Sequence, residues 1–145
     1  MVNRILVAAL LLALGACRRA DDIQRLEWPV MGTVAAVQWR NSELGADAAI
    51  EGRKIAGKVR KIFAEVERLL NRHDPNSEIC SLAGYSDGEV LRRASSPARP
   101  CYEAAFRMRD ATHGAFDPRW RGTNTLDLGA IAKCFAFDLA SAAID

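Results

Sequence analysis

The sequence predicts one compact domain of mixed α and β structure behind an N-terminal export signal. Three patterns lead to this prediction: an apolar run near the N-terminus, an extended segment rich in β-forming residues, and a series of helix-like patterns after it. The 145 residues are 50% hydrophobic and 26% charged, which allows an ordinary core and excludes disordered, collagen-like and disulfide-dense chains. A net charge of +2 provides no concentrated basic face, so nucleic acid is not an expected partner.

The N-terminus has the pattern of a bacterial lipoprotein signal. Arg4 is followed by the apolar run Ile5–Leu14, which is too short to span about 30 Å of hydrocarbon as a helix. The sequence Leu-Gly-Ala before Cys17 resembles a lipobox, in which the cysteine is lipidated and becomes the first residue. We therefore expect residues 1–16 to be a signal peptide and 17–25 a tether, with the chain anchored by lipid in the cell envelope and facing the periplasm. The alternative is an ordinary secretory signal with an incidental cysteine.

The remaining cysteines suggest no metal site. Lipidation of Cys17 would leave Cys80, Cys101 and Cys134, which allow at most one disulfide. No Cys-x-x-Cys or Cys/His cluster indicates structural zinc. An exported protein can hold a disulfide, but the spacing selects no pair, and we expect three partly buried thiols.

The first elements after the tether are an extended segment and a long helix. Residues 26–40 carry β-forming residues, with Pro29 and Gly32 as breaks near the start. After a turn-like stretch at 41–47, apolar residues recur at three- and four-residue spacing over 50–70, with charged residues at the other positions. This pattern predicts an amphipathic helix with one solvated face.

The rest of the chain alternates polar loops with shorter helices. Pro75 disfavours helical geometry at Asp74 and so ends the long helix. The expected segments beyond it are a helical turn at 77–82 capped by Asn76 or Ser77, a loop at 84–96 with one short strand at 89–91, a helix opened by Ser95, Ser96 and Pro97 that runs to about Thr112, and a helix from about Ala130.

Two polar segments near helix ends hold the candidate binding residues. Residues 127–133 place Asp127 and a glycine at a helix start with Lys133 on its first turns, where free N–H groups and a lysine suit a phosphate. Residues 114–117 combine a glycine, Phe116 and a carboxylate. The structural alternatives are that Asp127 is a helix cap and Phe116 a core residue. The chain lacks the phosphate-binding loop of common NTPases, the Rossmann glycine pattern and the hydrolase nucleophile elbow.

Four segments, in order, resemble motifs of the FAD:protein FMN transferase (ApbE) family. They are Met31-Gly32-Thr33, residues 73–79 (HDPNSEI), residues 112–118 (THGAFDP) and residues 126–133 (LDLGAIAK). The last two, at this order and spacing, carry most of the resemblance, and a lipoprotein signal is common in the family. The resemblance implies a single α+β flavin transferase domain over residues 26–145.

The resemblance also implies an activity and its partners. Members bind FAD and a divalent metal, usually Mg²⁺, and transfer FMN from FAD to a threonine hydroxyl of an exported redox protein, with release of AMP. Some relatives hydrolyse FAD instead. The expected partners are therefore FAD, a flavin-acceptor protein of an exported redox complex, and the membrane through the lipid anchor. The alternative is a noncatalytic, lipid-anchored flavin-binding protein or an inactive fragment of such an enzyme.

The motif positions imply roles for individual residues. The FAD-contacting positions correspond to Met31, His73, Ala115, Phe116, Asp117, Asp127 and Lys133. Ala130 corresponds to the residue whose backbone carbonyl binds the metal, and Cys17 to the lipidated residue. His73 stands where the family usually has an aromatic residue such as tyrosine, and buried packing is the alternative to flavin contact for Met31. The resemblance assigns no catalytic base.

The sequence departs from the family in three places. Cys134 stands where the family has a glycine, and residues 119–125 replace a much longer insertion that contains strands. The family's later metal ligands, an Asp and a Ser or Thr, have no counterpart in the 145 residues. We therefore expect a domain that is incomplete at its C-terminus.

Overall fold

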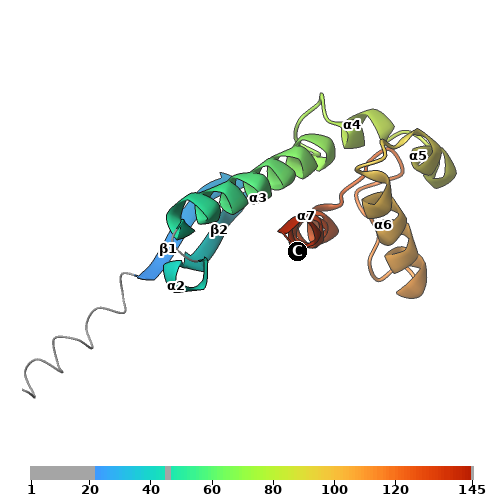
Figure 1. The fold of residues 1–145 in the computed structure, drawn as a ribbon. Helices are drawn as coiled ribbons and strands as arrows, with labels where there is room; N and C mark the ends of the chain where they lie inside the picture. The colour runs from blue at the N-terminus through green and yellow to red at the C-terminus, as the bar shows by residue number, and fades with distance from the viewer. Residues whose placement is uncertain (1–21, 45–46, 145) are drawn as a thin grey trace, which may run out of the picture. The chain divides into compact units, whose positions relative to one another are not determined.

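The computed structural model describes residues 22–44 and 47–144 and has an α+β fold, in which a β-hairpin is followed by six helices (Figure 1). These residues divide into two compact units, one with residues up to Trp28 and 35–56, the other with 29–34 and 57 onward. No helix of the described residues is long and apolar enough to cross a membrane. The predicted signal peptide, Cys17 and the first part of the tether lie outside the described residues.

The predicted extended segment is a two-stranded hairpin. Strand β1 spans Ile23–Val30 and β2 spans Thr33–Arg40, so β1 begins within the predicted tether. Met31 and Gly32 form the two-residue turn between them, with φ of 52° and 69°. Positive φ at both turn positions matches the right-handed twist of paired strands, which is why two-residue hairpins adopt it. The sequence break at Gly32 is therefore the tip of the hairpin.

The first unit is organised around a tryptophan and a glycine. Trp39 of β2 lies directly against Gly52, so closely that any side chain at position 52 would overlap the indole ring. Helix α2, Asn41–Leu44, begins where Asp22 accepts a hydrogen bond from Ser42 N at 3.0 Å. The hydrogen bonds from Ser42 lower the pKa of Asp22. Local side-chain contacts thus fix the end of the hairpin in this unit.

The long helix and the two short helices after it follow local signals. Helix α3 spans Ala48–Leu70, which confirms the predicted long helix, and α4 spans Glu78–Leu82 with Ser77 as its cap, also as predicted. The predicted strand at 89–91 is wrong, because α5 covers Asp87–Arg93. Glu89 accepts hydrogen bonds from the backbone and hydroxyl of Ser86, which forms a capping box that outweighs the β-forming residues of that segment.

The last two helices confirm the prediction, with small shifts in their ends. Helix α6 spans Arg99–Ala111, and α7 spans Gly129–Ile144. Buried positions on α7 are the small residues Ala132, Ala136 and Ala140. Small side chains let this helix approach its neighbours closely.

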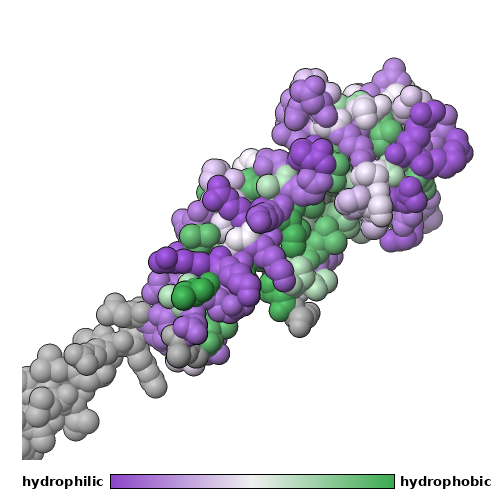
Figure 2. Space-filling view, turned by 45° about the horizontal axis from the view of Figure 1, so that its top comes forward, coloured by the Kyte–Doolittle hydropathy of each residue, from purple (hydrophilic) through white to green (hydrophobic). Residues whose placement is uncertain are grey.

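The core of the second unit is built from all of its helices. Its buried members include Tyr102, which is fully enclosed, and a set from α3 to α7: Val66, Leu69, Leu70, Ile79, Leu82, Val90, Ala105, Phe106, Leu126, Leu128, Ala132 and Ala136. Leu126 and Leu128 are loop residues, and their burial fixes the segment that leads into α7. Hydrophobic residues also remain at the surface among hydrophilic ones (Figure 2), and Phe137 of α7 is 65% exposed.

Candidate functional site

A pocket of about 480 Å³ lies in the second unit, where the hairpin tip, the end of α3, the loop after it and the start of α7 meet. Four of the residues predicted to contact FAD line this one pocket: Met31, His73, Asp127 and Lys133. The remaining lining residues are Gly32, Glu67, Leu70, Asn71, Arg72, Gly129 and Ala132. Its volume is in the usual range for small-molecule sites.

The hairpin tip forms one wall and is held in an uncommon conformation. Met31 has a φ of 52°, which is costly for a long side chain and persists only where neighbours enforce it. Its backbone N–H donates to Glu67 Oε1 of α3 at 2.7 Å. The side chain is partly buried and packs against the core. Met31 therefore packs against the core, as its alternative proposes, and also lines the pocket.

The loop after α3 forms the second wall and is fixed by its own polar groups. Asn71 Oδ1 accepts from His73 N at 3.0 Å, and Asp74 Oδ1 accepts from Asn76 N at 2.9 Å. Cys80 Sγ donates to the Arg72 carbonyl at 3.4 Å. Because these contacts fix the backbone, the exposed side chain of His73 lies on a loop of fixed conformation.

The start of α7 forms the third wall. Asp127 Oδ1 accepts from Gly129 N at 3.0 Å, so the carboxylate satisfies an otherwise free N–H of the first helical turn, as the capping alternative requires. Its other oxygen, Oδ2, lies 3.0 Å from Arg72 Nε. Lys133 is exposed in the second turn of the helix. Lys133, near the positive end of the helix dipole, therefore gives this wall a cation that suits an anionic group.

The other predicted FAD-contacting segment is not part of the pocket lining. Ala115 is exposed, and Phe116 packs against the core, as its structural alternative proposes. Asp117 Oδ1 accepts from Arg119 N at 2.8 Å. The structure thus brings Met31, His73, Asp127 and Lys133 together but places 115–117 in a turn that supports the core.

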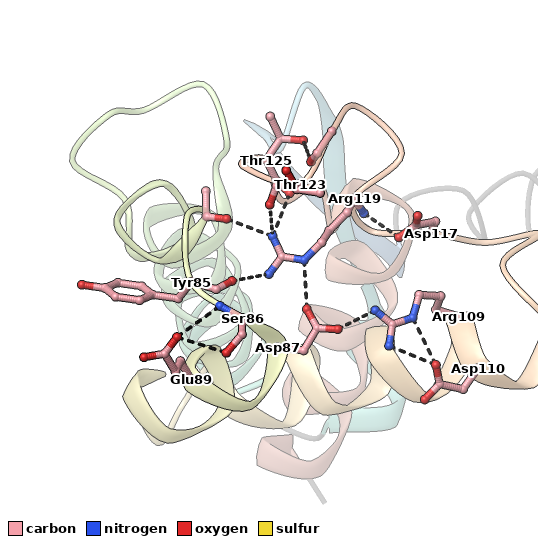
Figure 3. A network of polar contacts seen from close by, with 12 residues as sticks. Tyr85, Ser86, Asp87, Glu89, Arg109, Asp110, Asp117, Arg119, Thr123 and Thr125 are labelled. Carbon is pink, nitrogen blue, oxygen red and sulfur yellow. Dashed lines mark hydrogen bonds and ion pairs between the residues drawn. The ribbon is translucent and has the colours of Figure 1, made fainter.

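A network around Arg119 holds the loop that connects residues 115–117 to Asp127 (Figure 3). The Arg119 side chain is 13% exposed and donates to Asp87 Oδ1 at 2.9 Å, to the Ala83 carbonyl at 2.9 Å and to the Tyr85 carbonyl at 2.7 Å. Asp87 also pairs with Arg109 of α6. Burial raises the pKa of Asp87, but the hydrogen bonds from Arg109 and Arg119 outweigh it, and its pKa is lowered. The network ties α5, α6 and the 118–125 loop together.

Sequence reasoning did not find Arg72, Glu67 or the Arg119 network. Glu67 occupies a charged position of α3 that reads as part of a solvated face. Arg72 adjoins His73 in a polar loop, and that adjacency is the only sequence signal for it. Their partners are 55 and 36 positions away in the chain, at Asp127 and Met31, so only the folded chain reveals the contacts.

The residues present fit a flavin nucleotide better than they fit a magnesium ion. The pocket offers apolar surface from Met31, Leu70 and Ala132 for a ring system, and its polar side holds Arg72 and Lys133 for phosphate beside the carboxylates of Glu67 and Asp127. Mg²⁺ takes near-octahedral oxygen ligands. Ala130 lies in the first turn of α7, and the described residues contain no group of three or more His, Cys, Asp or Glu side chains that could hold a metal. One carbonyl does not make a magnesium site.

The cysteines described by the structure are free thiols in three different environments. Cys101 is buried, which raises the pKa of its thiol to about 12, and Cys80 is partly buried. Cys134 is exposed, so the expectation of three partly buried thiols is wrong. Cys134 is exposed because it follows Lys133 on the outer face of α7, away from the buried alanines.

No family model matches the sequence, and no curated protein and no solved structure matches it. The family resemblance therefore stays a prediction from the four motifs, beside the geometry of the pocket.

Proposed function

We propose that this chain binds FAD in the pocket between the hairpin tip and α7, as a protein of the FAD:protein FMN transferase type. The observation that carries the proposal is that residues from three separate motifs line one pocket: Met31, His73, and Asp127 with Lys133. These positions are far apart in the sequence, so their meeting is not a consequence of the motifs themselves. It is expected if the motifs share a ligand.

The pocket residues can bind and orient the two parts of the ligand. Met31 and Leu70 offer apolar surface to a flavin ring, and His73 can stack on it or donate to it. Lys133, near the positive end of the α7 dipole, suits the pyrophosphate. The proposed reaction transfers FMN to a threonine hydroxyl of an exported redox protein and releases AMP. The proposed reaction also calls for Mg²⁺, and the described residues do not supply its set of ligands.

A noncatalytic flavin-binding protein is the second candidate. It is favoured by the absence of an acidic cluster among residues 22–44 and 47–144, because the transferase reaction requires a metal that these residues do not hold by themselves. Both candidates share the flavin pocket and the proposed anchor at Cys17 in the cell envelope. Radioactive palmitate labelling of cells tests the anchor: label that persists in Cys17→Ser would exclude it.

Flavin binding is tested by fluorescence titration of FAD with the purified chain. We expect quenching by the wild-type chain and a loss of affinity of about tenfold for Lys133→Ala, because a charged hydrogen bond to phosphate is lost. Asp127→Ala should also weaken binding, since it removes the contact that fixes the start of α7. Lys54→Ala is the matched control, because Lys54 is an exposed lysine of α3 outside the pocket.

Unchanged affinity in both pocket variants would show that the assigned site is wrong. The two functions are then separated by incubation with FAD, Mg²⁺ and an acceptor that carries the threonine motif. Flavinylated acceptor together with AMP supports the transferase. Flavin binding without either product, beside an active transferase assayed in parallel, supports the noncatalytic protein.

A further inference from the structure

An ion pair between Arg72 of the loop after α3 and Asp127 at the start of α7 joins two walls of the pocket, and Arg72 lies outside the four motifs. Arg72 Nε lies 3.0 Å from Asp127 Oδ2, and the two side chains are 31% and 17% exposed. Arg121 Nε approaches the same oxygen at 3.7 Å, and its side chain is 44% exposed. Since the Arg72 pair is both shorter and less exposed to water, Arg72 compensates most of the Asp127 charge.

The charges of this wall favour an anion only while Asp127 is compensated. Asp127 Oδ1 is engaged by Gly129 N, and Oδ2 by the two guanidinium groups. Lys133, on the same wall, has no carboxylate within ion-pair distance among the described residues. The pocket lining thus holds two cationic side chains, Arg72 and Lys133, and two carboxylates, Glu67 and Asp127. Without Arg72, a carboxylate held only by the more exposed Arg121 would face the ligand.

We propose that Arg72 makes this pocket selective for phosphorylated ligands by neutralising Asp127. The ligand class is a nucleotide with a pyrophosphate, and the inference rests on the proposed function because FAD belongs to that class. Arg72 acts through Asp127 and is therefore a positioning residue. Its removal leaves Lys133 alone against the carboxylates of Asp127 and Glu67, which disfavours phosphate, and leaves the apolar surface of Met31 and Leu70 unchanged.

A purely structural role for Arg72 makes a different prediction. The loop that carries Arg72 is also fixed by Cys80 Sγ on the Arg72 carbonyl and by Asn71 on His73 N, and neither contact involves the guanidinium. A neutral residue at position 72 therefore changes the charge at Asp127 more than it changes the loop. If the ion pair served only to join the loop to α7, every ligand of the pocket would lose affinity equally.

The experiment titrates the purified full chain with riboflavin, FAD and ADP by calorimetry. The variants are Arg72→Gln, the double variant Arg72→Gln/Asp127→Asn, and Arg107→Gln as the control, since Arg107 is an exposed arginine of α6 outside the pocket. We expect Arg72→Gln to weaken FAD and ADP about tenfold and riboflavin by less than about twofold. The double variant should recover most of the loss, because Asn keeps the acceptor for Gly129 N without the charge.

Two results would overturn the inference. Equal weakening of all three ligands with no recovery in the double variant would assign Arg72 a structural role, and unchanged FAD binding would leave the proposed function standing without Arg72. A third result would support the inference and refute the flavin pocket. In that case ADP binding depends on Arg72, FAD binds no more tightly than ADP, and riboflavin does not bind. Absence of binding by all three ligands refutes both.

Discussion

Two polar segments of the second unit, 112–118 after α6 and 126–133 at the start of α7, use their polar groups differently. In the first, Thr112 Oγ1 accepts from Phe116 N at 3.0 Å and donates to the Met108 carbonyl at 2.8 Å, while Asp117 accepts from Arg119 N. In the second, Asp127 faces a pocket with cationic neighbours, and Lys133 reaches that pocket without a carboxylate partner among the described residues.

The two segments differ in whether their polar groups remain available to a ligand. Polar groups that are satisfied within their own turn have little left to offer a ligand, and Phe116 next to them is committed to the core. A cation that lines a pocket without an internal partner retains its capacity for a ligand. We therefore infer that residues 112–118 support the fold and that residues 126–133 recognise the ligand, and substitutions in each segment test this division.

The largest effect is expected for Arg119→Ala, which removes the side chain that ties the loop between the two segments to α5. Arg119 is 13% exposed and donates to Asp87 and to the carbonyls of Ala83 and Tyr85, so its loss leaves Asp87 paired with Arg109 alone and removes the donor of both carbonyls. We expect the free energy of unfolding to fall by about 3 kcal/mol. The same variant should weaken flavin binding, because Asp127 N donates to the Pro118 carbonyl of this loop at 2.8 Å.

Denaturant unfolding and FAD titration measure the two effects of Arg119→Ala. Arg107→Ala is the control, since Arg107 is exposed on α6. A variant as stable as the wild type would show that the hydrogen bonds in Figure 3 do not hold this loop. Lost stability with unchanged FAD affinity would show that the loop does not position Asp127.

An intermediate effect, on stability alone, is expected for Phe116→Ala. Phe116 is partly buried against the core, and truncation should cost about 2 kcal/mol, less than for a fully buried phenylalanine. Its FAD affinity under native conditions should match that of the wild type, in contrast to Lys133→Ala. A large loss of FAD affinity in a folded Phe116→Ala protein would contradict the division between support and recognition.

The sequence predicted the parts of the fold that local signals determine. Apolar spacing predicted α3, the Ser77 cap predicted α4, and Pro75 predicted the end of the long helix, because each depends on residues within one or two turns. The strand expected at 89–91 failed because Val90 and its neighbours favour either structure, and the Ser86–Glu89 capping box decides for helix.

Long-range pairing limits what could be predicted for the site. The motifs named Met31, His73, Asp127 and Lys133, and the structure brings them to one pocket. The same motifs also named Ala115, Phe116 and Asp117, which do not line the pocket. The local sequence does not distinguish an aromatic side chain that packs in the core from one that contacts a ligand. Arg72 and Glu67 depend on partners distant in the chain, and their residue types alone point to solvated surface.

The smallest effect concerns pH and the scaffold carboxylate Asp87. Its pKa in the folded chain is lowered below the ordinary 3.8, with the arginine hydrogen bonds outweighing burial. A lowered folded pKa stabilises the protein fully above the unfolded value, and this stabilisation is lost as the pH falls through the folded pKa. The free energy of unfolding of the wild type, measured between pH 7 and pH 3, should therefore approach that of Asp87→Asn as acid is added. A difference between the wild type and Asp87→Asn that stays constant over this pH range would show that the Arg109–Asp87–Arg119 contacts do not depend on the charge of Asp87.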